Sequence, residues 1–143
     1  MHLQVLTPNK KIFSEEIDEL IVNTMDGEIG ILPNHTHLVT RLKPGEMIIK
    51  IKGEQQYFAI TGGFLEVSKN KITILADYAV HSEDIGVEEV LQAKKRAEEI
   101  LKRAKEDISE RDFAAAQADL RKAILQLNIA NRRRRERSPI PHN

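Results

Sequence analysis

Apolar and polar residues alternate over short stretches of the first 86 positions, which is the period expected of β-strands. In MIIKIK, residues 47–52, Met47, Ile49 and Ile51 share one face, and KITILA, residues 71–76, repeats the pattern. Three more runs have strand length and are rich in β-branched or aromatic residues: ELIVNT, YFAI and FLEV. Turn signals such as KPGE and SKNK separate the runs, so the pattern predicts an antiparallel β-sandwich or barrel.

After Gly86 the apolar residues recur at steps of three and four, which predicts two amphipathic helices. Ser109 and Asp112 lie between them and have the spacing of a capping box. Such a short connection favours an antiparallel helical hairpin. The apolar stripes comprise Val90, Ala93, Ala97, Ile100, Leu101, Ala104 and Ile108 in the first helix, and Phe113, Ala116, Leu120, Ala123, Ile124, Leu127 and Ala130 in the second.

Glycine and proline mark the boundary between the two halves. All seven glycines lie at or before Gly86, and residues 87–137 contain neither glycine nor proline. The expected fold class is α+β, with an N-terminal antiparallel β-sandwich followed by a C-terminal antiparallel two-helix hairpin. The expected domains are a β-sandwich at 1–86, a helical hairpin at 87–131 and a basic, disordered tail at 132–143.

About half of the helical stripe is alanine. A methyl-sized group contributes roughly 0.8 kcal/mol on burial, against roughly 1.5–3 kcal/mol for a leucine or isoleucine. The hairpin is therefore expected to dock weakly on other elements, and a weakly docked element can be moved by a partner. The alternative is an ordinary helical appendage.

Composition excludes several classes of site. The 143 residues include no cysteine, which removes disulfides, thiol nucleophiles and thiolate metal ligands. No apolar run approaches the roughly 18 residues of a membrane span, and the N-terminus lacks the apolar core of a signal peptide. We expect a soluble protein that can still be a peripheral part of a membrane assembly.

The formal net charge of +0 hides a gradient along the chain. Residues 1–86 hold eight Lys and Arg against twelve Asp and Glu, whereas residues 132–143 hold five against one. A basic footprint confined to a terminal tail argues against a nucleic-acid partner. Runs of like charge are usually solvated and disordered; the alternative is that Arg132–Arg135 extend the second helix towards an acidic partner.

The stretch GEIGILPNHTHLV, residues 27–39, is the candidate for site chemistry. A metal-dependent enzyme built on Glu28, His35 and His37 is one hypothesis, but the remaining histidines are isolated in the sequence, so no metal site is expected. No motif of nucleophilic catalysis or phosphate binding is present. A loop shaped by glycine and proline, on which a partner docks, is the favoured interpretation.

Three segments together resemble the epsilon subunits of rotary (F-type) ATP synthases, from about Leu3 to Asn131. They are GEIGILPNHTHLV, AITGGFLEVSKNKITILADYA and the alanine-rich hairpin. His37 stands where that family has a second proline. The positions that match the family's loop are Gly27, Glu28, Ile29, Gly30, Ile31, Leu32, Pro33, Asn34, His35 and Leu38, and GGFLEV at 62–67 matches as well.

The resemblance implies a non-catalytic rotor subunit in the central stalk, whose sandwich contacts the gamma subunit and the ring of c subunits. The residues it assigns to that contact are Glu28, Gly30, Leu32, Pro33, Asn34 and His35. It also implies that the extended hairpin meets the alpha/beta catalytic head and inhibits ATP hydrolysis. The basic residues available for acidic beta-subunit segments are Arg121, Lys122, Arg132, Arg133, Arg134 and Arg135.

Some members of the family bind ATP at the hairpin. At the positions that match this pattern, Glu89 takes the acidic position, Gln92 replaces an arginine, Lys122 keeps its charge and Gln126 replaces a second basic residue. Losing two cations predicts weak or absent ATP binding and no cofactor. An ATP-sensing module remains the alternative function. The resemblance implies membrane contact only through the complex, on the cytoplasmic face of a bacterial plasma membrane or, alternatively, on a thylakoid membrane.

Overall fold

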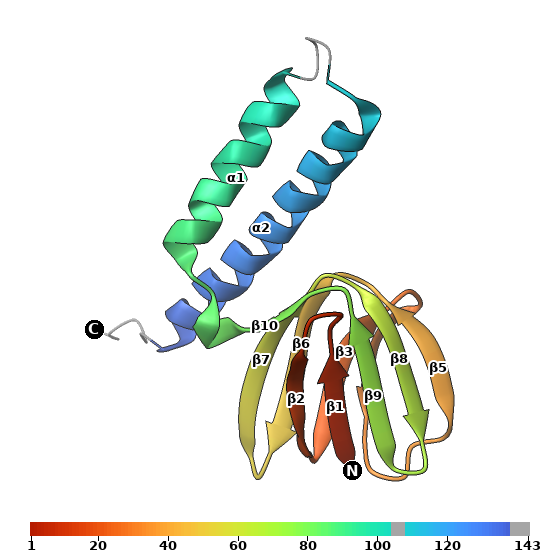
Figure 1. Ribbon diagram of the computed structural model, residues 1–143. Helices are drawn as coiled ribbons and strands as arrows, with labels where there is room; N and C mark the ends of the chain where they lie inside the picture. The colour runs from red at the N-terminus through yellow and green to blue at the C-terminus, as the bar shows by residue number, and fades with distance from the viewer. Residues whose placement is uncertain (104–107, 138–143) are drawn as a thin grey trace, which may run out of the picture. The chain divides into compact units, whose positions relative to one another are not determined.

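The computed structural model describes residues 1–103 and 108–137, which fall into two compact units, Met1–Ser82 and Glu83–Asn143. The first unit is built of strands and the second of helices (Figure 1). The chain therefore changes from strand to helix close to Gly86, where the glycines end.

The five predicted runs ELIVNT, MIIKIK, YFAI, FLEV and KITILA each fall on a strand of the first unit, which also contains strands that the pattern did not identify. Their bounds are β1 His2–Leu6, β2 Lys11–Glu16, β3 Glu19–Thr24, β4 Gly27–Ile31, β5 Leu38–Leu42, β6 Gly45–Ile51, β7 Glu54–Ile60, β8 Gly63–Ser68, β9 Lys71–Ala76 and β10 Ala79–His81. A 3-10 turn, η1, spans Ser82–Asp84.

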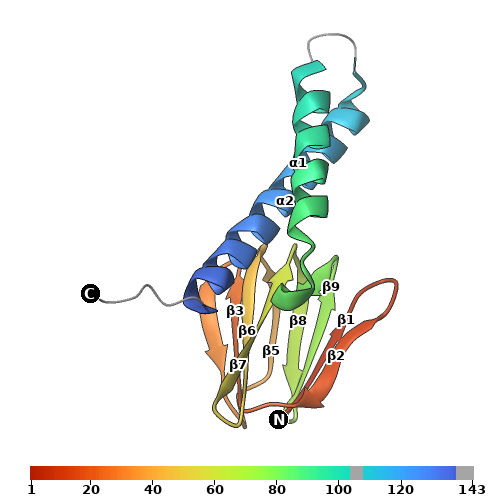
Figure 2. The same cartoon turned by 90° about the vertical axis from the view of Figure 1, so that its left-hand side faces the viewer.

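The strands pair in the order β10-β7-β6-β3-β5-β8-β9-β1-β2, and β4 pairs with β3 beside this path. This sheet folds over to form a sandwich, as the two views of Figures 1 and 2 show. The pairs are antiparallel with one difference from expectation: β1 runs parallel to β9, from His2 opposite Lys71 to Leu6 opposite Leu75. The first strand thereby reaches a strand that is distant in sequence, and local periodicity carries no information about such a pairing.

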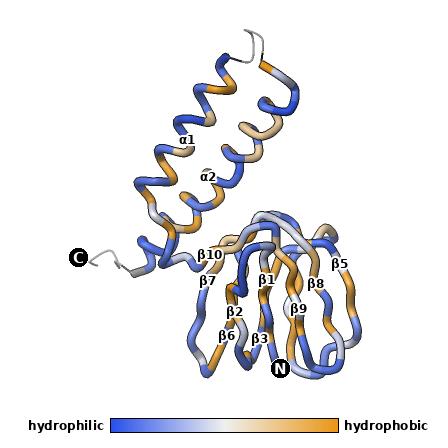
Figure 3. Tube along the Cα trace, in the orientation of Figure 1, coloured by the Kyte–Doolittle hydropathy of each residue, from blue (hydrophilic) through white to orange (hydrophobic). Residues whose placement is uncertain are grey.

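One apolar core lies between the layers of the sandwich, and it uses the faces that alternation predicted. Met47 and Ile49 of β6 and Ile72 and Ile74 of β9 are each 0% exposed. In Figure 3 the strands alternate between hydrophobic and hydrophilic positions along their length. The alternation thus reports the side of the sheet that each residue occupies.

Two tight turns require left-handed backbone. Lys52 and Gly53 connect β6 to β7, and Lys69 and Asn70 connect β8 to β9; all four residues have positive φ. Two successive positive-φ residues are typical of a type I′ turn, whose twist matches that of the flanking strands. The predicted turn SKNK is therefore a hairpin turn, and the connection between β6 and β7 is another.

In the second unit, α1 spans Val87–Lys102 and α2 spans Glu110–Arg137, and the two pack as an antiparallel pair. The hydroxyl of Ser109 accepts the backbone N–H of Asp112 at 3.1 Å, which confirms the predicted N-cap of α2. Ala97, Ala116 and Ala123 are buried, as the alanine-rich stripe predicted.

The helix ends differ from expectation in two places. Ile108 lies between the helices and not in the first one, because α1 ends at Lys102; Ala104 lies outside the described residues. Arg132–Arg137 continue α2, where the sequence analysis expected a disordered tail. Arginine is a good helix former, and no glycine or proline interrupts the chain before Pro139. Residues 138–143 lie outside the described residues.

Candidate partner-binding surfaces

The β3–β4 hairpin presents the GEIG segment. The Thr24 hydroxyl donates to the carbonyl of Gly27 at 2.7 Å and accepts the N–H of Asp26 at 3.2 Å. Gly27 has φ 122°, a conformation that L-residues rarely adopt. The side chain of Thr24 and the flexibility of Gly27 together define this turn.

Glu28 and Gly30 lie on the outer side of β4, opposite Asn23 and Ile21 of β3. Both are exposed, whereas Ile31 is fully buried and Ile29 is packed against the core. The alternation within GEIGI thus directs the carboxylate to solvent and the isoleucines inwards. Because Gly30 carries no side chain, the backbone of β4 is accessible beside Glu28.

A tight turn over Leu32–His35 follows β4, and we call it the Leu32 turn. The N–H of His35 donates to the carbonyl of Leu32 at 3.2 Å. Pro33 occupies the second position and Asn34, with φ 66°, the third, an arrangement typical of a type II turn. Leu32 is 56% exposed, so the turn holds an apolar side chain out in water.

Of the His-x-His pair, His35 is the last residue of the Leu32 turn and His37 lies in the connection to β5; neither belongs to a strand. Nδ1 of His35 lies 2.8 Å from the carbonyl oxygen of Thr36. Because a carbonyl only accepts, this nitrogen carries the proton and Nε2 is the other, unprotonated ring nitrogen when the ring is neutral. Within residues 1–103 and 108–137, no group of three His, Cys, Asp or Glu side chains is placed to hold a metal ion.

A second surface lies on the outer side of three adjacent strands, and we call it the β5–β8–β9 face. Val39, Phe64 and Leu75 contribute one exposed apolar side chain from each strand, at 61%, 52% and 54% exposure. Phe64 is paired with Leu75 on one side and with Arg41 on the other. The side chains therefore form one apolar surface from segments far apart in the sequence.

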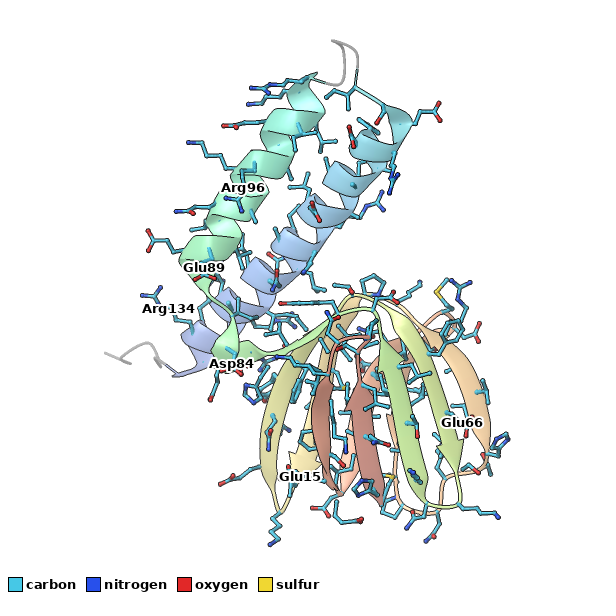
Figure 4. All side chains as sticks on the ribbon, viewed as in Figure 1. Glu15, Glu66, Asp84, Glu89, Arg96 and Arg134 are labelled. Atoms are coloured by element: carbon cyan, nitrogen blue, oxygen red, sulfur yellow. The ribbon has the colours of Figure 1, made fainter. Side chains whose placement is uncertain are left out.

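The β5–β8–β9 face is hollowed and has polar groups among its apolar ones. A shallow depression of about 160 Å³ is lined by Val39, Phe64, Leu75 and Thr73, together with Glu66, which Figure 4 labels. The Arg41 guanidinium lies 5.8 Å from the centre of the Phe64 ring, at a distance where cation–π attraction operates. Clustered apolar side chains with a polar surround are typical of protein interaction sites.

The β5–β8–β9 face was not predicted from the sequence. Its signal was present in the alternation: KITILA places Leu75 on the opposite side from Ile72 and Ile74. FLEV likewise places Phe64 on the opposite side from Leu65, which is fully buried. Apolar residues on both sides of these strands indicate that the outer side can also contact a partner. The strand order that joins Val39, Phe64 and Leu75 cannot be read from one sequence.

The regulatory candidates lie on α2 with different exposure. Arg121, Arg132, Arg134 and Arg135 are exposed, and Lys122 is half-buried. Arg133 is buried, and its guanidinium donates to the Glu136 carboxylate at 2.6 Å. Within the arginine run, Arg132, Arg134 and Arg135 are therefore exposed, whereas Arg133 forms an ion pair with Glu136 of the same helix.

The residues considered for ATP binding also differ in exposure. Glu89 and Gln92 are exposed on α1, Lys122 is half-buried and Gln126 is buried on α2. Figure 4 labels Glu89 near the start of α1 and Arg134 near the end of α2. The uncharged Gln92 and Gln126 offer no cation to a phosphate at either position.

The β1–β2 pair carries a polar cluster at its end. The Met1 amine lies 3.1 Å from Oε2 of Glu16, and Nδ1 of His2 lies 3.2 Å from Oε1 of the same carboxylate. Nε2 of His2 lies 3.1 Å from the hydroxyl of Ser14. The hydrogen bond from the Met1 amine, with a smaller contribution from His2, lowers the pKa of Glu16 below its usual value.

Both halves of the chain match known families. Residues 1–82 match the family described as ATP synthase, Delta/Epsilon chain, beta-sandwich domain. Residues 83–131 match the one described as ATP synthase, Delta/Epsilon chain, long alpha-helix domain. The boundary between the matches coincides with the boundary between the compact units.

Relatives of similar length align with this chain across both of its units. The ATP synthase epsilon chain of Nitrosococcus oceani is 40% identical over 137 residues, covering 95% of this chain and 96% of the relative. The ATP synthase epsilon chain of Nitratidesulfovibrio vulgaris is 37% identical over 129 residues, covering 90% and 94%.

Solved structures share the fold. A chain of the Euglena gracilis mitochondrial ATP synthase OSCP/F1/c-ring structure superposes with a TM-score of 0.68 at 23% identity, covering 90% of this chain and 79% of that one. A chain of the Tetrahymena thermophila mitochondrial ATP synthase central stalk/c-ring gives 0.58 at 18% identity, covering 90% and 95%. Within the described residues, no helix has the length and apolar composition needed to cross a bilayer. The sandwich, the hairpin and the close relatives together establish that this chain belongs to the delta/epsilon chain family of ATP synthases.

Proposed function

We propose that this chain is a non-catalytic subunit of the central stalk of a proton-translocating ATP synthase, where it links the gamma subunit to the c ring. The observation that carries the proposal is the match of both units to the ATP synthase delta/epsilon family, with epsilon chains among the relatives. Assembly would hold the chain at the membrane, on the cytoplasmic face of a bacterial plasma membrane.

Two surfaces of the sandwich suit these stalk partners. The Leu32 turn offers Leu32 as an exposed apolar contact, and the start of β4 offers the exposed Glu28 carboxylate for a polar loop of the c ring or gamma. The β5–β8–β9 face offers Val39, Phe64 and Leu75 as a broader apolar area. We assign both surfaces to gamma and the c ring, because exposed apolar side chains gain most from burial against a partner.

Single exposed side chains test this assignment. Replacing Phe64 with serine removes the aromatic group from the β5–β8–β9 face, and replacing Leu32 with serine does the same for the turn. Each is expected to weaken binding to a gamma–c-ring subcomplex by roughly 1–2 kcal/mol, about 5- to 30-fold. Leu91→Ser is the matched control, since Leu91 is 49% exposed on α1. Equal binding by all three variants and the wild type would remove the assignment.

We further propose that the helical unit restrains ATP hydrolysis by contacting the alpha/beta head. The contact between α1 and α2 buries small alanines and leaves Leu91, Ile100 and Ile124 exposed for a partner, which favours an element that can change partners. Exposed Arg121, Arg132, Arg134 and Arg135 supply positive charge for acidic segments of the beta subunits.

Truncation after Gly86 is the direct experiment. The truncated chain is expected to assemble into the complex and to raise its rate of ATP hydrolysis. A finer test replaces Arg134 and Arg135 with glutamine and compares this variant with Lys95→Gln/Arg96→Gln, which removes the same charge from exposed positions of α1. Only the α2 variant is expected to raise hydrolysis; an unchanged rate after truncation would refute the restraint.

A further inference from the structure

Asn70 stands in the tight turn between β8 and β9, where its backbone has φ 61°. Asparagine tolerates this left-handed conformation better than most residues, and glycine adopts it without steric cost. The backbone conformation of this turn would therefore also be adopted by glycine. The asparagine side chain makes a contact that glycine could not make.

The side chain of Asn70 reaches a segment 36 residues earlier in the sequence. Its Oδ1 accepts the backbone N–H of Asn34, in the Leu32 turn, at 3.0 Å. The backbone carbonyl of Asn70 also accepts the N–H of His2, at the start of β1, at 3.1 Å. One residue thus joins the β8–β9 turn, the first strand and the Leu32 turn.

The hydrogen bond is made to Asn34, the residue of the Leu32 turn that has a left-handed backbone conformation. Asn34 has φ 66°, and the hydrogen bond internal to the turn uses the N–H of His35 and leaves that of Asn34 for another acceptor. The Asn70 oxygen supplies this acceptor from a hairpin that is itself held by the β8–β9 ladder. The orientation of exposed Leu32 and half-buried His35 therefore depends on a residue outside the turn.

We propose that Asn70 is a positioning residue for partner binding, which fixes the Leu32 turn in the shape that the stalk partner recognises. This inference rests on the proposed function, since it takes the turn to be a contact surface. A preformed loop binds more tightly than a mobile one because less conformational freedom is lost on association.

Two substitutions separate the side chain of Asn70 from its backbone. Asn70→Gly keeps the left-handed turn and removes the acceptor, whereas Asn70→Asp keeps an acceptor oxygen in the same place. In the full-length chain, Asn70→Gly is expected to speed exchange of the Asn34 amide about threefold to tenfold, the effect of losing one hydrogen bond. Asn70→Asp is expected to exchange like the wild type, and both variants should keep the thermal midpoint of the sandwich.

Association with a gamma–c-ring subcomplex provides the second measurement. Asn70→Gly is expected to weaken binding by a similar factor, and Asn70→Asp is expected to restore it. Unchanged exchange at Asn34 in Asn70→Gly would overturn the positioning role. Faster exchange with unchanged binding would overturn the link to the partner.

Leu32→Ser in the same binding assay distinguishes failure of this inference from failure of the proposed function. If Leu32→Ser weakens binding and Asn70→Gly does not, the turn is a contact but Asn70 does not position it. If neither variant affects binding, the Leu32 turn is not a partner contact and the assignment of this surface is wrong.

Discussion

At the scale of single residues, Gly63 is the position with the least room for a side chain. Its φ is 141°, and a Cβ added there would lie 2.1 Å from the carbonyl oxygen of Leu75 and 2.9 Å from Cα of Ala76. Both atoms belong to the backbone of β9, which cannot rotate away. Glycine at the start of β8 therefore allows the close strand pairing that brings Phe64 beside Leu75.

Gly63→Ala is expected to destabilise the sandwich by roughly 3 kcal/mol or more, since it combines left-handed strain with a backbone clash. Gly53→Ala is the control, because Gly53 also has positive φ but a Cβ there meets nothing within 4 Å. It should cost only about 1–2 kcal/mol. Urea unfolding of both variants measures the difference; equal losses would contradict the clash.

A second prediction for a single residue concerns pH. The pKa of Glu16 is lowered in the folded chain by the Met1 amine first and His2 next. The ionised carboxylate therefore stabilises the fold above its unfolded value near 4.5, and this contribution is lost as pH falls through the lowered pKa. Because the carboxylate is exposed, the effect is small.

Thermal unfolding of Glu16→Gln at several pH values tests the contribution of this carboxylate. The variant should melt slightly below the wild type at pH 7, and the difference should shrink as the pH falls below 4.5. Glu15→Gln removes the same charge at the adjacent strand position, labelled Glu15 in Figure 4, and serves as the control. A difference that persists at low pH would argue against ionisation as its cause.

At the scale of elements, α2 is held at its start by a side chain and near its end by an ion pair. Ser109 caps the first turn, and Arg133 pairs with Glu136 three residues later. The cap satisfies a backbone N–H that the helix itself leaves without an acceptor. The ion pair explains how a run of like charges remains helical, since the one acidic residue among the arginines neutralises a neighbour.

Ser109→Ala is expected to destabilise α2 by about 1 kcal/mol, and Ser109→Asp is expected to preserve it. Hydrogen exchange in the full-length chain measures this at the residue concerned. The Asp112 amide should exchange faster in the alanine variant only, because that amide donates to the Ser109 hydroxyl. Equal exchange in the two variants would show that the cap contributes nothing.

At the scale of the whole molecule, the sandwich has a core of its own. The buried cluster extends from Leu3 to Ala79, so its members lie inside the first compact unit, Met1–Ser82. A unit with a complete core should fold without its neighbour. The proposed role, a stalk subunit whose hairpin changes partners, requires this independence.

Residues 1–82 expressed alone are therefore expected to fold and to unfold cooperatively, with a midpoint close to that of the sandwich in the full-length chain. Amide spectra of the fragment and the full-length chain should coincide at core positions such as Ile49 and Ile74. A fragment that aggregates or lacks dispersed amide signals would contradict the independence of the unit.

Features that depend on neighbouring residues could be predicted from the sequence. Alternation assigned Met47, Ile49, Ile72 and Ile74 to the core, and local spacing identified the cap at Ser109. Matching motifs indicated the family, because the shape of a loop such as the Leu32 turn depends on particular residue types, here Pro33 and Asn34, which can be read in the sequence.

Features that join residues far apart in the sequence could be seen only in the folded chain. It paired β1 with β9 in parallel, joined Val39, Phe64 and Leu75 into one surface, and brought the Asn70 side chain to the backbone of Asn34. Each of these contacts depends on strand order. Hydrogen bonds between strands distant in sequence, together with packing in the common core, determine that order. No periodicity within one segment encodes that order, so these surfaces became visible only in the folded chain.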